Sequence, residues 1–166
     1  MKQIILLVLI ITGSIFVSPV SAEYFKTFDG KVKTLQDYVG KGKWTIVMMW
    51  AHDCHVCNKE AHQYVAFHDK HKNKDAIVLG ISMDGFEAQD KAEKFIKQHK
   101  LNFENIIGKP QVIANMYEEL TGADWFGTPT FLFFAPNGEL KAQQVGAVPT
   151  PLIEQFMAKQ VSANGS

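Results

Sequence analysis

One stretch predicts a strand, a short polar loop and the start of a helix, in that order. It reads Thr45-Ile46-Val47-Met48-Met49-Trp50-Ala51-His52-Asp53-Cys54-His55-Val56-Cys57. The run 44–50 is almost wholly apolar, which is typical of a central strand that is covered on both faces. Cys54 and Cys57 are the only cysteines in the 166 residues, so any thiol chemistry must use this pair.

The spacing of the two cysteines suits reversible disulfide chemistry. Positions i and i+3 of a first helical turn lie on one face, close enough for a disulfide to form and break without movement of the backbone. The free N–H groups and the positive dipole end of the helix favour a thiolate on Cys54, which makes Cys54 the better nucleophile.

Two other uses of the pair compete with this interpretation. An inert structural disulfide would close almost no loop and would therefore contribute little stability. A zinc site would need further ligands, and no second pair shows the spacing of a structural site. The candidate ligands are His52, His55, His62, His68 and His71. Because CxxC between a strand and a helix is a redox signature, we favour redox chemistry and predict no metal site.

The N-terminus has the features of a signal peptide over residues 1–22. Met1-Lys2 supplies a positive start, residues 4–17 form an apolar run, and small residues up to Ala22 predict cleavage before Glu23. The apolar run is shorter than the roughly 20 residues that a membrane-spanning helix needs, and an uncleaved anchor is the alternative. The expected location is therefore periplasmic or otherwise extracytoplasmic, where a CxxC pair can cycle between dithiol and disulfide.

The remainder, residues 23–166, has the size of one domain. Its strands are expected at 44–50, 76–83, 103–107, 130–134 and 140–145, and its main helices at 54–72, 87–100, 111–120 and 152–160, with fraying from Ser162. Strands that alternate with helices before a closing hairpin and helix predict a three-layer α/β fold, in which helices flank a mixed central sheet. The chain has 17 basic and 17 acidic residues, and this balance gives no indication of nucleic-acid binding.

Several motifs together resemble the thioredoxin fold, and most closely the TlpA/ResA/CcmG (DsbE)-like family of exported thiol-disulfide oxidoreductases. They are Trp50-Ala51 before the CxxC pair, Cys57-Asn58-Lys59-Glu60, Gly127-Thr128-Pro129-Thr130-Phe131, and Asn137-Gly138. The resemblance covers most of the chain after residue 22.

The resemblance implies roles for individual residues. Cys54 matches the exposed nucleophile and Cys57 the resolving thiol. Pro129 matches a proline whose preceding bond is cis, which would place the Thr128 backbone beside the cysteines to pair with an extended substrate. Glu60, one helical turn beyond Cys57, matches an acidic residue that would accept the Cys57 proton.

Other residues near the pair are candidates for tuning or substrate binding. His55 departs from the family's usual apolar or proline content, and a protonated imidazole there would make the disulfide more oxidising. Trp50 and Trp125 are candidates for flanking the active site, with core packing as the alternative. His52 and Asp53 are expected to line the rim of the loop.

The resemblance implies a reductase of exported proteins, with apocytochrome c as one candidate substrate, that uses no cofactor. A membrane thiol protein would supply its electrons, and the protein would be a monomer. One alternative is an oxidant or isomerase of the same fold. Another is a copper or zinc chaperone, although such copper chaperones usually space their cysteines by three residues and add a distal histidine. A peroxidase is disfavoured because Cys54 lacks the threonine or proline partners of a peroxidatic site.

Overall fold

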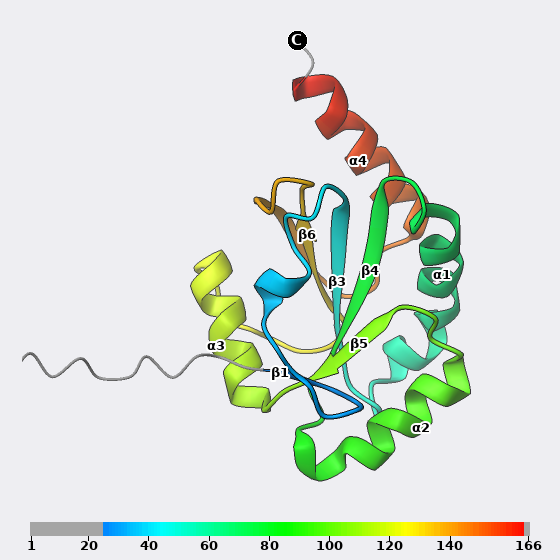
Figure 1. Cartoon of the computed structure of the whole chain (residues 1–166), viewed down its shortest axis with the longest axis vertical. Coiled ribbons are helices and arrows are strands. Elements are labelled where there is room, and N and C mark those ends of the chain that lie inside the picture. The colour runs from blue at the N-terminus through cyan, green and yellow to red at the C-terminus, as the bar shows by residue number, and fades with distance from the viewer. Residues whose placement is uncertain (1–24, 165–166) are drawn as a thin grey trace, which may run out of the picture.

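The computed structural model describes residues 25–164 as a three-layer α/β fold (Figure 1). In chain order the elements are β1 (Phe25–Thr27), β2 (Val32–Lys33), the 3₁₀ turn η1 (Leu35–Asp37), β3 (Trp44–Trp50), α1 (His55–His71), β4 (Ala76–Ser82), the 3₁₀ turn η2 (Phe86–Ala88), α2 (Gln89–His99), β5 (Glu104–Ile107), α3 (Pro110–Thr121), β6 (Thr130–Phe134), β7 (Leu140–Val145) and α4 (Thr150–Asn164). The predicted fold class is confirmed.

The seven strands form one mixed sheet in the order β2-β1-β5-β4-β3-β6-β7. The pairs β3–β4 and β4–β5 are parallel, whereas β6 and β7 add antiparallel strands on one side and β1 and β2 on the other. β3 lies inside the sheet, and every one of its residues is buried, as its apolar sequence predicts.

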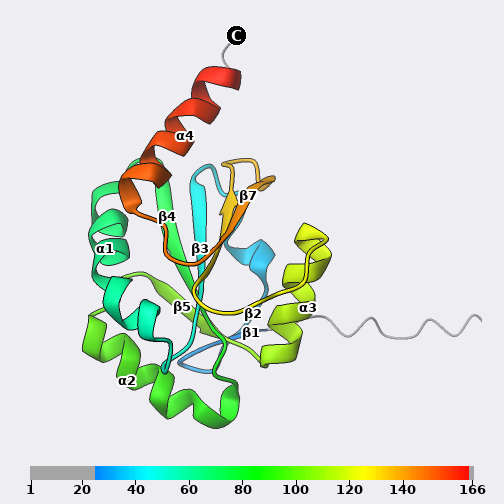
Figure 2. The same cartoon turned by 180° about the vertical axis from the view of Figure 1, so that it is seen from behind.

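Alternation along β3 divides the core into two layers. Trp44, Ile46, Met48 and Trp50 pack with the buried side chains of α1, α2 and α4. Val47 and Met49 instead pack with those of α3. The cartoons agree with this division: α1, α2 and α4 lie on one side of the sheet and α3 on the other (Figure 1, Figure 2).

The sheet brings three loops to one end. Because β3 and β4 are parallel and Trp50 pairs with Ser82, the loops that follow them emerge at the same edge. β6 runs in the opposite direction, and Thr130 at its start pairs with Met49. The segment just before Thr130 therefore lies at the same edge as the CxxC loop.

The predicted helices and strands agree with the structure to within a few residues at their ends, except at the C-terminus. Fraying was expected from Ser162, but α4 continues to Asn164. The Ser162 hydroxyl donates to the Ala158 carbonyl one turn earlier, which satisfies an acceptor in the last turn. The predicted signal peptide, residues 1–22, lies outside the described residues, and no helix within residues 25–164 has the length and apolar character needed to cross a membrane.

Candidate functional site

Cys54 and Cys57 form a disulfide at the start of α1, with their Cα atoms 5.2 Å apart. Cys54 is the N-cap residue of the helix, and its Sγ accepts a hydrogen bond from the Cys57 backbone N–H at 3.0 Å. Cys57 is fully buried, whereas Cys54 is only partly buried. The two sulfurs therefore differ in access, and only Cys54 is open to a partner.

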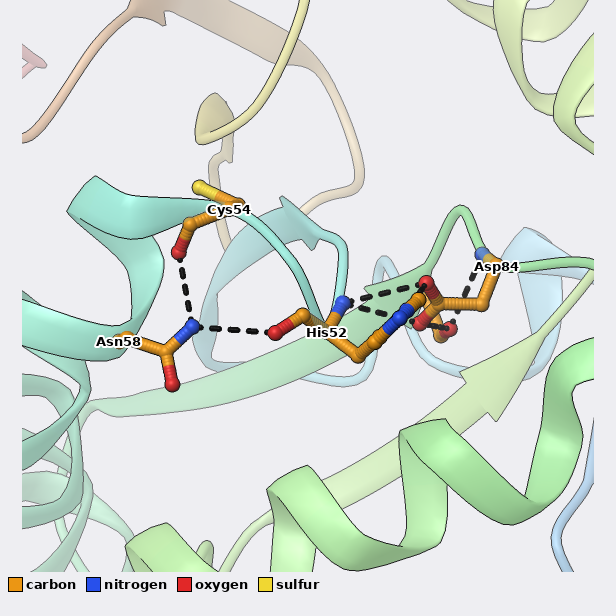
Figure 3. A network of polar contacts seen from close by, with 5 residues as sticks. His52, Cys54, Asn58 and Asp84 are labelled. Atoms are coloured by element: carbon orange, nitrogen blue, oxygen red, sulfur yellow. Dashed lines mark hydrogen bonds and ion pairs between the residues drawn. The ribbon is translucent and has the colours of Figure 1, made fainter.

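The loop before Cys54 is anchored to the end of β4 by Asp84 (Figure 3). The Asp84 carboxylate, whose side chain is 3% exposed, accepts the His52 backbone N–H at 3.1 and 3.2 Å and contacts His52 Nδ1 at 2.5 Å. The Ser82 hydroxyl donates to the same carboxylate at 2.7 Å. His52, which was expected to line the rim, is thus turned toward the end of β4.

Asn58 anchors the same loop from the side of α1. Its Nδ2 donates to the carbonyl oxygens of His52, at 3.0 Å, and Cys54, at 2.9 Å. Its Oδ1 lies 2.9 Å from Nε2 of His99, at the end of α2. His52 is consequently bound through its N–H on one side and its carbonyl on the other (Figure 3).

The Thr128–Pro129 peptide bond is cis, as predicted. Pro129 is buried, and its carbonyl accepts the Gly146 N–H at 2.8 Å, which joins this segment to the end of β7. Since β6 begins at Thr130 opposite Met49, the cis peptide lies at the edge of the sheet that carries the CxxC loop.

Glu60 lies on α1, one turn after Cys57, and its side chain is 25% exposed. Its carboxylate accepts a hydrogen bond from Gln63 Nε2 at 2.6 Å, and Gln63 Oε1 accepts the Thr150 N–H at the start of α4. The carboxylate is thus partly buried and is connected to α4 through Gln63, and its role as acceptor of the Cys57 proton stays a prediction.

The two tryptophans lie in different surroundings. Trp50 is fully buried, stacks on Phe95 with ring centroids 4.4 Å apart, and donates its indole N–H to Asn105 Oδ1 at 3.1 Å. This burial corrects the prediction that Trp50 flanks the active site, because the side chain has no surface to offer a substrate. Trp125 is half-buried, and its indole N–H has no hydrogen-bond partner within residues 25–164.

His55 and Asp53 are exposed beside the pair. Among the described residues, ligand atoms of His52, Asp53 and Asp84 lie within 4.8 Å of one another, a grouping that could hold a metal ion. The Asp84 oxygens already accept hydrogen bonds from Ser82 and His52, and these bonds account for the closeness of His52 to Asp84.

Asp84, Asn58 and His99 were not predicted as site residues. Asp84 has the clearest signal in the sequence, because it follows a buried parallel strand and the carboxyl ends of neighbouring parallel strands share one edge. Asn58 is four residues beyond Cys54, within reach of the first helical carbonyl. No signal in the sequence connects His99 to Asn58, since their contact depends on the packing of α2 against α1.

Comparison with known proteins matches the chain to one protein family and to one fold. The model of the AhpC/TSA family matches residues 20–143. No curated protein sequence matches the chain significantly.

Several solved structures are similar. The thioredoxin domain of a thiol-disulfide oxidoreductase from Bacteroides vulgatus is 21% identical, with a TM-score of 0.67 over 81% of this chain and 91% of that chain. A thiol:disulfide interchange protein from Chlorobium tepidum is 18% identical, with a TM-score of 0.68 over 82% and 90%. A secreted disulfide oxidoreductase from Mycobacterium tuberculosis, described as homologous to DsbE of E. coli, is 19% identical, with a TM-score of 0.63 over 81% and 94%. Likeness at these identities establishes the thioredoxin-like fold.

Proposed function

Since this chain belongs to the AhpC/TSA family, we propose that it is a thiol-disulfide oxidoreductase that reduces disulfides of exported proteins outside the cytoplasm. The observation that carries the proposal is the Cys54–Cys57 disulfide at a helix N-terminus, with one accessible and one buried sulfur. An accessible sulfur is needed to meet a substrate, and a protected one is needed to resolve the mixed disulfide without competing for substrates.

The reaction begins from the reduced pair. The Cys54 thiolate attacks one sulfur of a substrate disulfide, forms a mixed disulfide and releases the other substrate sulfur, which takes up a proton. Cys57 then loses its proton and attacks Cys54 Sγ, which releases the second substrate thiol and leaves the Cys54–Cys57 disulfide. Two electrons and two protons pass to the substrate, and the pair alone carries the electrons, so no cofactor is required.

Glu60 is the proposed acceptor of the Cys57 proton. It lies one turn along α1 from Cys57, and its half-buried carboxylate can take a proton directly or through one water molecule. A membrane thiol protein is the proposed electron donor that returns the pair to the dithiol. This assignment rests on the extracytoplasmic location that the N-terminal sequence predicts.

The proposed substrate segment is an extended peptide beside the cis Thr128–Pro129 bond. Thr128 would pair with it through its backbone, in the manner of an added strand. Exposed apolar side chains occur in the segment before this bond, on β7 and in the first turn of α1: Phe126 is 79% exposed, Val145 42% and Val56 39%. The exposed His55 and the half-buried Trp125 complete the proposed contact surface. Such a surface suits unfolded exported proteins, of which apocytochrome c is one candidate.

The equilibrium redox potential of the pair, measured against dithiothreitol or glutathione on metal-free protein, tests the proposal. A potential near that of thioredoxin, about −270 mV, is the result expected for a reductase. A potential near about −120 mV would make the protein an oxidant, with the exposed His55 as the cause to examine. Absence of any reversible couple would overturn the redox function and favour metal binding.

Trapping of mixed disulfides checks the separate roles of the cysteines. The Cys57→Ser variant keeps the accessible nucleophile and lacks the resolving thiol, so it should accumulate mixed disulfides with a disulfide-bonded protein. The Cys54→Ser variant should accumulate far fewer, because its remaining thiol is buried. Equal trapping by the two variants would contradict the assigned roles.

A further inference from the structure

Two side chains form hydrogen bonds to the loop that carries Cys54, and a third side chain binds one of these two. Asp84, after β4, binds the His52 N–H and ring, while Asn58 on α1 binds the His52 and Cys54 carbonyls. His99 at the end of α2 binds Asn58 in turn. The bonds from Asp84 and Asn58 lie outside the disulfide and hold the loop (Figure 3). The Cα atoms of Cys54 and Cys57 are 5.2 Å apart in this conformation.

The contact with His99 supports the orientation of the Asn58 amide. An amide presents one accepting oxygen and one donating nitrogen, and the two ends have nearly the same shape. The two loop carbonyls can only accept, so the nitrogen of Asn58 is directed at them, and Oδ1 on the other side is placed to accept from His99 Nε2, which supports the same orientation. The His99 ring is itself held by packing, with its centroid 4.4 Å from that of Phe95.

These contacts affect the two oxidation states differently. In the disulfide state, the Cys54–Cys57 bond restrains the loop by itself, so loss of a hydrogen bond returns little conformational freedom. In the dithiol state, the loop is restrained by its hydrogen bonds, those with the Asn58 and Asp84 side chains among them, and loss of these bonds gives it more freedom to move. Restraining two reacting groups in the dithiol raises their effective concentration and so favours formation of the bond.

We propose that Asn58, oriented by His99, and Asp84 are positioning residues that preorganise the dithiol for closure and make the Cys54–Cys57 pair more reducing. The inference rests on the proposed oxidoreductase function. It assigns these residues no contact with the reacting sulfurs of the substrate. Their effect is transmitted by the backbone of residues 52–54.

The principal test is the redox potential of the Asn58→Leu variant, which keeps the size and neutrality of the side chain and removes its donor. We expect the equilibrium constant for closure to fall about tenfold, which makes the potential less negative by about 30 mV for this two-electron couple. Asp84→Asn should shift it in the same direction. Asn115→Leu is the matched control, because Asn115 is exposed on α3 and its side chain accepts a hydrogen bond from Gln111, which is also exposed.

A milder variant and a double-mutant cycle guard against loss of folding. His99→Phe keeps a ring against Phe95 and removes the donor to Asn58. We expect a smaller shift of the same sign, and no further shift when His99→Phe is added to Asn58→Leu, because His99 acts through Asn58. Additive shifts would overturn the assigned role of His99.

Stability measurements separate positioning from a general structural role. Asn58→Leu should lower the free energy of unfolding of the oxidised protein more than that of the reduced protein. The difference between these two losses is the loss of disulfide stability in the folded protein, and it is measured as the change in redox potential. Equal losses in both forms, with an unchanged potential, would overturn the inference while leaving the proposed function intact. If the unmodified protein showed no reversible couple, the proposed function itself would fail.

Discussion

Among single residues, His68 shows how burial connects proton binding to stability. It lies on α1, is 8% exposed, and its Nδ1 accepts the backbone N–H of Val78 on β4. Burial, assisted by the nearby Lys72 charge, lowers the pKa of His68 below its usual value. A proton on Nδ1 would also remove the acceptor that Val78 uses.

The folded protein should therefore lose stability as the pH falls below about 6.5, the ordinary histidine pKa. The unfolded chain takes up the proton first, so the contribution of His68 is complete above that pH and declines as the pH falls toward the lowered value. Urea denaturation at pH 7.5 and 5.5 measures the loss. His68→Asn, which keeps an acceptor for Val78 and does not titrate, should show a smaller difference between the two pH values. Exposed His62→Asn should behave as the unmodified protein does, and an equal difference in all three would contradict the assignment.

Residue contacts were the hardest part of the molecule to predict from sequence. The CxxC pair and Pro129 carry motifs, and the structure has the disulfide and the cis bond. The sequence makes Trp50 a candidate for flanking the active site, with core packing as the alternative, because its position next to the loop does not reveal its neighbours. In the structure Gly80 makes room for it: a Cβ there would lie 1.9 Å from Asn105 Oδ1, the partner of the Trp50 indole. These three residues lie on three different strands, and the sequence of one strand does not show which residues of the others it will contact.

Among the elements, α1 and the segment before α4 are joined by one tyrosine. The Tyr64 hydroxyl donates to the Val148 carbonyl and accepts the Val148 N–H, both at 3.1 Å. Burial raises the pKa of Tyr64 to about 12, so the hydroxyl keeps its proton at any physiological pH. Both polar groups of the Val148 backbone depend on this side chain.

Tyr64→Phe should lower the free energy of unfolding by about 1–3 kcal/mol, because it leaves a buried N–H and a buried carbonyl unpaired. Denaturant titration of the oxidised protein measures the loss. Tyr38→Phe is the matched control, since its hydroxyl donates a long, exposed hydrogen bond to Glu104, at 3.4 Å, and the change should alter stability by less than about 0.5 kcal/mol. Similar losses of unfolding free energy in the two variants would show that the buried hydrogen bonds of Tyr64 contribute no more to stability than the exposed one of Tyr38.

The elements themselves were predictable because their signals are local. The apolar runs in β3, β4 and β6 are long enough to identify buried strands, and Asn137-Gly138 marks the hairpin between β6 and β7. The end of α4 was less predictable, since the serine that continues the helix also occurs commonly in frayed termini. Contacts between helices, such as that of α2 with α1, were beyond the sequence because periodicity identifies a buried face without identifying its neighbour.

For the molecule as a whole, the disulfide and exposed apolar side chains are gathered at one edge of the sheet. Phe126 is 79% exposed and lies in the segment that leads into the cis Thr128–Pro129 bond. Large apolar side chains exposed together beside a reactive group mark a surface for a partner. We therefore expect these apolar side chains to recognise a protein substrate, while the two thiols carry out the exchange.

Phe126→Ser should therefore slow exchange with a protein disulfide by about tenfold, since burial of a phenylalanine contributes roughly 1.5–3 kcal/mol. Exchange with glutathione should be unchanged, because this small disulfide does not cover the surface. The rates of insulin and glutathione reduction measure the two effects. Val161→Ser, which removes an apolar side chain that is 66% exposed on α4, should alter neither rate. Equal slowing with insulin and glutathione would mean that Phe126 acts on the thiols and not on recognition.

The two outer strands of the sheet determine how readily a second copy of this protein can add to its edges. β2 has only two residues, and β7 pairs with β6 through an irregular register at Phe133 and Phe134. β7 also carries Lys141 and exposed glutamines along its length. Short, bent and polar outer strands are poor templates for the addition of another chain. Both edges of the sheet therefore disfavour edge-to-edge addition of a second copy of this protein.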